Sequence, residues 1–292
     1  LRLRIRDDGS AQLNSLPPLD PILLDLDEAD FTCWAQSRAQ VHMDLSKAVY
    51  ECAFAAHADG GVSWYLNVHH IASDGLSAAM LVQAVEAIYQ GRDPDLGAFY
   101  REACAPDPSK TEDAARAHWA ARRPVERVGR LYGPVRADAP EAARQPVVLA
   151  KDAAAQLLDG GKGPFRLLTP ALTRAALTVF ATGLYLHRIT GAERFSVGLV
   201  ISQRERLGLM STIGPAFEVF PVDLTFEADD THLTAYRRAV ASLMTTLKNS
   251  VPGTAPAPDY EALVNILADP VACRSFAGQA AVATWLHAGS VA

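Results

Sequence analysis

The stretch HHIASDG, residues 69–75, decides how the rest of the chain is interpreted. It directly follows VSWYLNV, residues 62–68, in which every second residue is apolar, a pattern typical of a half-buried strand. It directly precedes LSAAMLVQAVEAIY, residues 76–89, which is apolar on most sides and indicates a largely buried helix. The sequence therefore predicts a strand, a polar turn and a helix, with the turn at the edge of a sheet where a substrate can reach it.

The turn contains residue types suited to acid–base chemistry. Successive strand residues point to opposite faces, so His69 and His70 cannot both face one cavity. We expect hydrogen bonds to hold one of them in the interior, while the other removes a proton from an attacking amine or hydroxyl. Asp74 can orient an imidazole or pair with an arginine, and the N–H of Gly75 can face negative charge developing on a carbonyl oxygen. The spacing is equally compatible with two structural histidines and an Asp74 that caps the helix.

The pattern His69-His70-x-x-x-Asp74-Gly75 after a strand resembles the HHxxxDG motif of nonribosomal peptide synthetase condensation domains. These domains belong to the superfamily of chloramphenicol acetyltransferase and other CoA-dependent acyltransferases. The resemblance implies an α/β fold of two chloramphenicol acetyltransferase-like lobes that form a V-shaped pseudo-dimer around a channel. It also implies catalytic roles for His70 and Gly75, organising roles for His69 and Asp74, and a place in the channel for Ser73. Whether the second histidine acts as a base or positions the amine stays open.

A second match lies at the end of the apolar run FSVGLVI, residues 195–201. In the family the corresponding strand ends in a Gly-Arg pair whose arginine commonly pairs with the motif aspartate. Arg204 falls at the matching place, with Gln203 in place of the glycine. The resemblance therefore implies an Asp74–Arg204 ion pair that joins the two halves, although an arginine after a strand can also be a surface residue.

A third match is GPAFEVFP, residues 214–221, which aligns without gaps to the family segment GxFVNTxPL. Glu218 stands where the family usually has an asparagine that supports the floor of the channel. This departure puts ordinary condensation activity in question. We treat Glu218 as a channel candidate whose carboxylate either binds an amine nucleophile or lies in water.

Length and composition set the domain organisation. The 292 residues are 49% hydrophobic and 21% charged, enough for one large or two medium domains. We predict an N-terminal lobe over residues 1–130 that carries the motif, an inter-lobe linker over 131–146, and a C-terminal lobe over 147–292. The family matches begin partway through the expected domain and stop before its last elements, so we expect a domain truncated at both ends.

Composition also excludes some functions. A net charge of −6 with no lysine or arginine block argues against a nucleic-acid partner. The sequence contains no run of 18 apolar residues, so it predicts no membrane-spanning helix. The four scattered cysteines show no metal spacing and fit a reducing cytosol, so we expect a cytoplasmic protein without a metal. The remaining pattern predicts helices over 28–42, 111–123, 171–190 and 231–248, a hairpin of strands 49–56 and 62–68, and strands over 20–27, 147–150 and 281–286. Residues 259–264 loosely resemble the PFExLV helix of the family, so the resemblance implies a further helix there.

The resemblance implies a specific reaction. A condensation domain joins an acyl or peptidyl thioester to an amine, and both reactants arrive on phosphopantetheine arms. The partners would be donor and acceptor peptidyl carrier protein domains and adjacent synthetase modules, and no cofactor would be bound. Three alternatives remain. They are a CoA- or carrier-dependent O/N-acyltransferase, a non-catalytic partner-recruiting domain, and an epimerisation domain, whose usual EGHGR stretch this sequence lacks.

Overall fold

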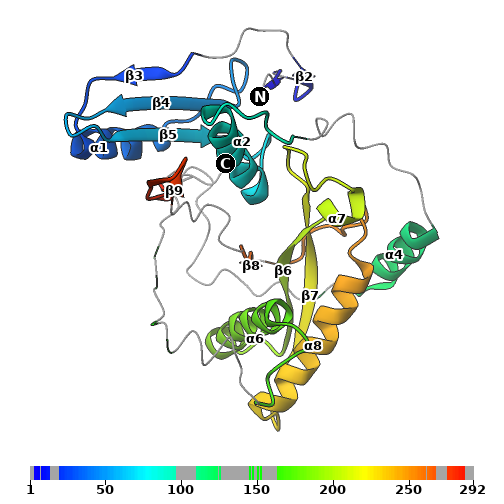
Figure 1. The fold of residues 1–292 in the computed structure, drawn as a ribbon. Helices are drawn as coiled ribbons and strands as arrows, with labels where there is room; N and C mark the ends of the chain where they lie inside the picture. The colour runs from blue at the N-terminus through cyan, green and yellow to red at the C-terminus, as the bar shows by residue number, and fades with distance from the viewer. Residues whose placement is uncertain are drawn as a thin grey trace.

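The computed structural model describes residues 3–6, 8–13, 20–96, 110–123, 125, 145, 147, 150, 152, 163–260, 262–267 and 275–286. The predicted linker over 131–146 and the predicted strand over 147–150 lie outside the described residues, apart from isolated positions. The lobe boundaries therefore stay a prediction. The described elements form a mixed α/β fold with one three-stranded sheet in each half of the chain (Figure 1).

The N-terminal sheet has the order β3-β4-β5. The strands are β3 (Ile22–Leu24), which runs parallel to β4 (Tyr50–Ala56), and β5 (Val62–Val68), which forms the predicted antiparallel hairpin with β4. Helix α1 (Glu28–Ala39) packs on one face of this sheet. A separate hairpin of β1 (Leu3–Ile5) and β2 (Ala11–Leu13) lies at the start of the chain.

The apolar side chains that alternate along β5 do not form its most buried face. Tyr65 is buried against α1, with its ring 5.3 Å from that of Trp34, whereas Val62 on the other face is 65% exposed. The face of Val62 and Trp64 is partly covered by a hairpin of β9 (Ser275–Phe276) and β10 (Gln279–Ala280). Figure 1 shows β9 beside β5. The alternation was therefore predicted correctly, but a distant segment decides which face is buried.

The C-terminal sheet has the order β7-β6-β8. Strand β6 (Arg194–Ser202) pairs antiparallel with β7 (Phe217–Thr225) and parallel with β8 (Leu263–Val264). Helices α6 (Pro170–Thr190) and α8 (His232–Asn249) pack on one face, and the turn after β6 forms the short helix α7 (Arg204–Leu207). The largest buried side chains of this core include Phe195, Leu224, Tyr236 and Leu243.

The long helices begin and end where the sequence predicts. Thr169 caps α6 by accepting a hydrogen bond from the N–H of Leu172, and Gly191 ends it in the left-handed conformation, with a φ of 73°. Thr231 caps α8 in the same way. Local capping chemistry thus fixes these boundaries.

Two predicted elements near the end of the chain are wrong. The segment 259–264 is not a helix, because Leu263–Val264 joins the sheet as β8 and the ring of Tyr260 lies over Gly198 of β6. The segment 281–286 is not a strand; it runs without a sheet partner among the described residues, and Leu286 packs against the N-terminal core. In both places apolar residues serve tertiary contacts that local patterns do not reveal.

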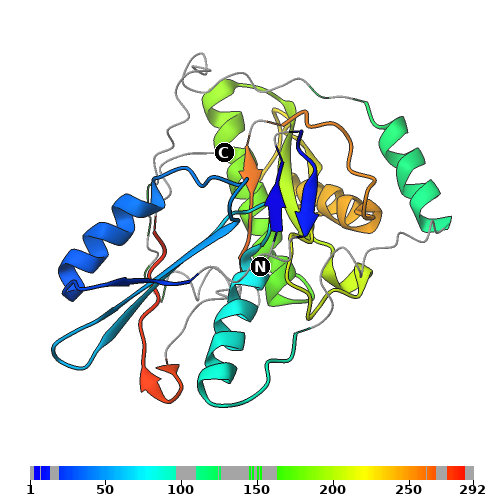
Figure 2. The ribbon, with the colours of Figure 1, turned by 90° about the horizontal axis from the view of Figure 1, so that it is seen from above.

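Helix α4 (Lys110–Ala121) belongs to the N-terminal half of the sequence but packs on the C-terminal half. Its Trp119 donates a hydrogen bond to the carbonyl oxygen of Asn249 at 2.9 Å, and the Trp119 ring lies 5.6 Å from that of Phe220. Figures 1 and 2 both show α4 beside α8 and away from α2 (Gly75–Tyr89). Within the part of the chain that the structure describes, no helix is long and apolar enough to cross a membrane.

Candidate active site

The turn between β5 and α2 is held closely by backbone hydrogen bonds. The N–H of His69 donates to the carbonyl oxygen of Val49 at 2.8 Å, which extends the ladder of the β4–β5 hairpin, and the N–H of Ala72 donates to the carbonyl oxygen of His69 at 2.9 Å. Asp74 then caps α2 by accepting from the N–H of Ser77 at 2.8 Å. The strand end and the helix start thus fix both sides of the turn.

His70 is exposed, and its ring is oriented by a backbone group. Its Nδ1 lies 2.7 Å from the carbonyl oxygen of Ser73. A carbonyl oxygen only accepts, so Nδ1 carries the hydrogen of this bond and Nε2 of the neutral ring keeps a free lone pair. The ring centroid lies 5.2 Å from that of Phe217, the first residue of β7. The imidazole therefore faces the second half of the chain and presents a proton acceptor there.

His69 has a different environment. Its Nδ1 accepts a hydrogen bond from the N–H of Ile71 at 3.1 Å. Burial, together with the charge that His70 can carry, lowers the pKa of His69 below its ordinary value of 6.5. His69 is thus half-buried and His70 exposed, and the backbone orients both rings. The catalytic roles assigned to them stay predictions.

The predicted ion pair between Asp74 and Arg204 is present. Nη2 of Arg204 lies 2.8 Å from one carboxylate oxygen of Asp74, and Nε lies 3.2 Å from the other. The N–H of Ala216 donates to the same carboxylate at 3.1 Å. Burial alone raises the pKa of Asp74, but the hydrogen bonds from Arg204, Ser77 and Ala216 outweigh it, and the pKa lies below the ordinary 3.8.

Arg204 is 1% exposed, and all of its N–H groups can find acceptors. Nη1 donates to the carbonyl oxygens of Leu209 and Thr212 at 2.8 and 2.6 Å. Nη2 also reaches the hydroxyl of Ser77 and the carbonyl oxygen of Gly214, both at 2.7 Å. A fully satisfied guanidinium of this kind is rigid, so the motif turn is fixed against the loop between β6 and β7.

The other predicted site residues fall into two groups. Ser73 is buried, with 6% exposed, and supplies the carbonyl that orients His70; Gly75 is the first residue of α2. Glu218 lies next to Phe217 on β7 and therefore on the opposite face of the strand. Its carboxylate accepts from the N–H of Gly253 at 2.6 Å. The structure thus places Ser73 and Gly75 with the histidine turn but does not bring Glu218 to the imidazole.

Two residues of the site were missed at the level of sequence. Ser77 is fully buried, and its hydroxyl accepts from Arg204 and from the N–H of Gly214 at 3.0 Å. Its position three residues after Asp74, at the start of a helix, was the available signal. Phe217 forms the wall opposite His70, but an apolar residue in a strand carries no signal of such a role. Among the described residues no group of His, Cys, Asp and Glu side chains is arranged to hold a metal ion.

Comparison with solved structures gives clear matches. The starter condensation domain of rhizomide synthetase, solved as a mutant in complex with C8-CoA, superimposes with a TM-score of 0.64 at 21% identity, covering 91% of this chain and 66% of that one. The first condensation domain of the calcium-dependent antibiotic synthetase, with a substrate analogue, gives 0.61 at 19% identity, covering 90% and 67%. The X-domain from teicoplanin biosynthesis gives 0.59 at 18% identity, covering 90% and 65%.

The chain has the condensation-domain fold. It spans about two thirds of the length of these structures. No protein-family model matches the sequence, and no curated protein matches it either. This likeness confirms the predicted α/β fold class.

Proposed function

We propose that this chain forms an amide bond between an acyl or peptidyl thioester and an amine, as the catalytic part of a condensation domain in nonribosomal peptide synthesis. The observation that carries the proposal is the orientation of His70. The carbonyl of Ser73 holds Nδ1, so Nε2 is free as a proton acceptor and the ring faces Phe217 of the other half.

The reaction follows from this geometry. The amine nitrogen attacks the thioester carbonyl carbon while Nε2 of His70 either accepts the amine proton or positions the amine. Negative charge then develops on the carbonyl oxygen. Gly75 is the first residue of α2, so its N–H lies at the positive end of that helix and would donate a hydrogen bond to that oxygen. The carbon–sulfur bond breaks, the thiolate takes up the proton, and the amide is released.

The reactants would be carried on phosphopantetheine arms of donor and acceptor peptidyl carrier protein domains, next to other synthetase modules in the cytoplasm. Two tethered reactants aligned at one imidazole gain much of their rate from proximity, an effect worth on the order of 7–11 kcal/mol when alignment is ideal. The role of His69, Asp74 and Arg204 is to keep the imidazole in that alignment. No cofactor takes part in this scheme.

The proposal is tested by intact-mass detection of product on an acceptor carrier protein supplied with a panel of loaded donor carrier proteins. We expect wild-type chain to extend the acceptor and His70→Ala to abolish extension while carrier binding stays near normal. His232→Ala is the matched control, because His232 is an exposed histidine at the start of α8. Retained extension by His70→Ala would remove His70 from the mechanism.

The same assay separates the related acyltransferase reaction. The rhizomide synthetase domain was solved with C8-CoA, so an acyl-CoA donor belongs in the panel. Acylation from acyl-CoA without any carrier protein would assign the chain to a CoA-dependent acyltransferase. Carrier binding without any product, for every donor and for both CoA and carrier forms, would identify a partner-recruiting domain.

A further inference from the structure

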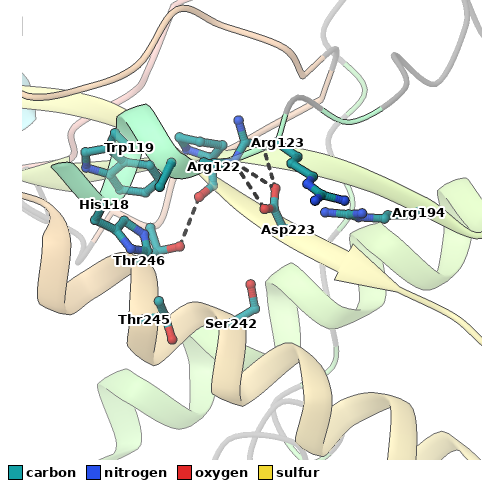
Figure 3. A pocket seen from close by; sticks show the side chains of 11 residues that line it. His118, Trp119, Arg122, Arg123, Arg194, Asp223, Ser242, Thr245 and Thr246 are labelled. Atoms are coloured by element: carbon teal, nitrogen blue, oxygen red, sulfur yellow. Dashed lines mark hydrogen bonds and ion pairs between the residues drawn. The ribbon is translucent and has the colours of Figure 1, made fainter. Parts of the chain in front are cut away.

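A cavity lies away from the histidine turn. It has a volume of about 420 Å³ and sits between the end of α4, the edge strand β7 and α8. Figure 3 shows its lining, which combines the guanidinium groups of Arg122, Arg123 and Arg194 with hydroxyl side chains of α8 such as Ser242 and Thr245. Asp223 is the only carboxylate among the residues that line it in the described part of the chain.

Arg122 forms a fixed wall of this cavity. Its Nη2 lies 2.6 Å from the carboxylate of Asp223 and 2.7 Å from the hydroxyl of Ser196, and its Nη1 lies 2.7 Å from the carboxylate of Asp259. The Arg122 side chain is only 10% exposed. Burial opposes the charge, but the two carboxylates outweigh it and raise the pKa of Arg122. Both carboxylates are therefore already taken by Arg122.

Arg123 and Arg194 are left with free charges. Arg123 follows Arg122 directly, and Arg194 stands two residues before Ser196 on β6, so it projects from the same face of the sheet. In the described chain neither residue forms an ion pair, and Figure 3 shows their guanidinium groups next to each other beside Asp223. The three arginines outnumber the two carboxylates, Asp223 and Asp259, so the cavity carries an excess positive charge. Arg123 and Arg194 are exposed, so water screens much of their mutual repulsion, and an anion between them removes the rest.

We propose that this cavity binds a phosphate ester at a site separate from His70. Guanidinium groups present planar forks of donors that match phosphate oxygens, and the hydroxyl of Ser242 adds a further donor. The volume lies within the range of small-molecule sites. Asp223 stands six residues after Phe217 on β7. Six residues of strand span roughly 20 Å, so the cavity at Asp223 is separated by that distance from Phe217, which contacts His70. The phosphate can belong to a free small molecule or to a phosphopantetheine arm.

Isothermal titration calorimetry at constant ionic strength tests the site with two probes, inorganic pyrophosphate and phosphopantetheine. The test variant is Arg123→Gln combined with Arg194→Gln. The control is Arg188→Gln on α6, which removes the same charge from an exposed position. We expect the Kd to rise about tenfold or more for each guanidinium removed and to stay unchanged in the control, since each charge-assisted contact is worth at least a tenfold change in affinity. Tighter binding of one probe identifies the source of the phosphate.

Two results would overturn the proposal. One is the absence of heat from wild-type chain with both probes at millimolar concentration. The other is equal weakening in the Arg188→Gln control and the double variant, which would indicate a nonspecific charge effect. His70→Ala should bind pyrophosphate as wild type does, and a loss there would disprove a separate site. Thermal unfolding of every variant verifies that it folds. The test does not involve acyl transfer, so its outcome is independent of the proposed function.

Discussion

Asp74 and Arg204 join two halves of the chain through a forked ion pair across 130 residues of sequence. Arg204 is 1% exposed, so its removal leaves a partly buried carboxylate and several carbonyls without their donor. Arg204→Ala should therefore lower the free energy of unfolding by about 3–5 kcal/mol, the usual cost of breaking a buried pair. Denaturant unfolding measures this, with exposed Arg188→Ala as the control. A change of the same small size in both variants would show that the pair does not hold the halves together.

Ser77 should be more important than its residue type suggests. Its buried hydroxyl accepts hydrogen bonds from Arg204 and from the N–H of Gly214, and it donates to the carboxylate of Asp74. Ser77→Ala leaves the buried N–H of Gly214 without its acceptor and removes one of the acceptors of Arg204, so it should cost about 1–3 kcal/mol. Ser37→Ala is the matched control, because that exposed hydroxyl only bonds to the carbonyl of Cys33 in its own helix. Equal unfolding free energies for the two variants would contradict a structural role for Ser77.

The ion pair also predicts how stability depends on pH. The pKa of Asp74 in the folded state lies below 3.8, so the folded state holds this proton less tightly than the unfolded state does. The stabilisation is therefore complete above pH 3.8 and is lost as the pH falls through the lower, folded-state pKa. Asp74→Asn should be less stable at neutral pH and show a flatter decline in acid. Unfolding free energies between pH 6 and pH 2 test this, and parallel curves would refute it.

His69 should titrate at a lower pH than an ordinary histidine. Burial lowers its pKa first, and the charge of His70 lowers it further, from 6.5. The unfolded state then takes up a proton more readily, so this residue reduces stability as the pH falls below 6.5. Long-range nitrogen NMR should show a midpoint below 6.5 and, at neutral pH, a proton on Nε2, since Nδ1 accepts from Ile71. A midpoint at or above 6.5 would contradict this.

Gly198 should tolerate no side chain. A Cβ built there would lie 2.5 Å from the ring of Tyr260, so Gly198→Ala must displace Tyr260 and the segment that carries Asp259 and β8. We expect a loss of roughly 1–3 kcal/mol from overpacking. The double variant Gly198→Ala with Tyr260→Leu should recover part of this loss by making room. The unfolding free energies of the single and double variants measure the coupling between the two positions. If the double variant recovers no stability, the contact with Tyr260 is not the source of the loss.

The sequence was informative where local chemistry decides the structure. The strand before His69, the helix after Asp74 and the bounds of α6 follow from alternation, apolar periodicity and capping preferences. The Asp74–Arg204 pair came from a resemblance that carried a long-range contact with it. These predictions needed no knowledge of how the halves pack.

The sequence was uninformative where the partner lies far away in the chain. The buried face of β5 depends on α1 and on a hairpin about two hundred residues later, and β8 depends on the room that Gly198 leaves. The arginine-lined cavity brings together residues 122 and 123, residue 194 and helix α8, which no local pattern connects. Glu218 stays a channel candidate from alignment alone; strand alternation places it on the opposite face of β7 from Phe217, where it accepts from the N–H of Gly253.

The β9–β10 hairpin has a consequence for biosynthesis. Phe276 rests against Trp64 and Tyr89, and the N–H of Ala277 bonds to Glu86, so late residues finish a surface made of early ones. Because translation runs from the N-terminus, Trp64 and Tyr89 are synthesised long before the β9–β10 hairpin that covers them. The apolar surface around Trp64 and Tyr89 is therefore exposed to water in the nascent first half. A chaperone that shields this surface would raise the yield of folded chain.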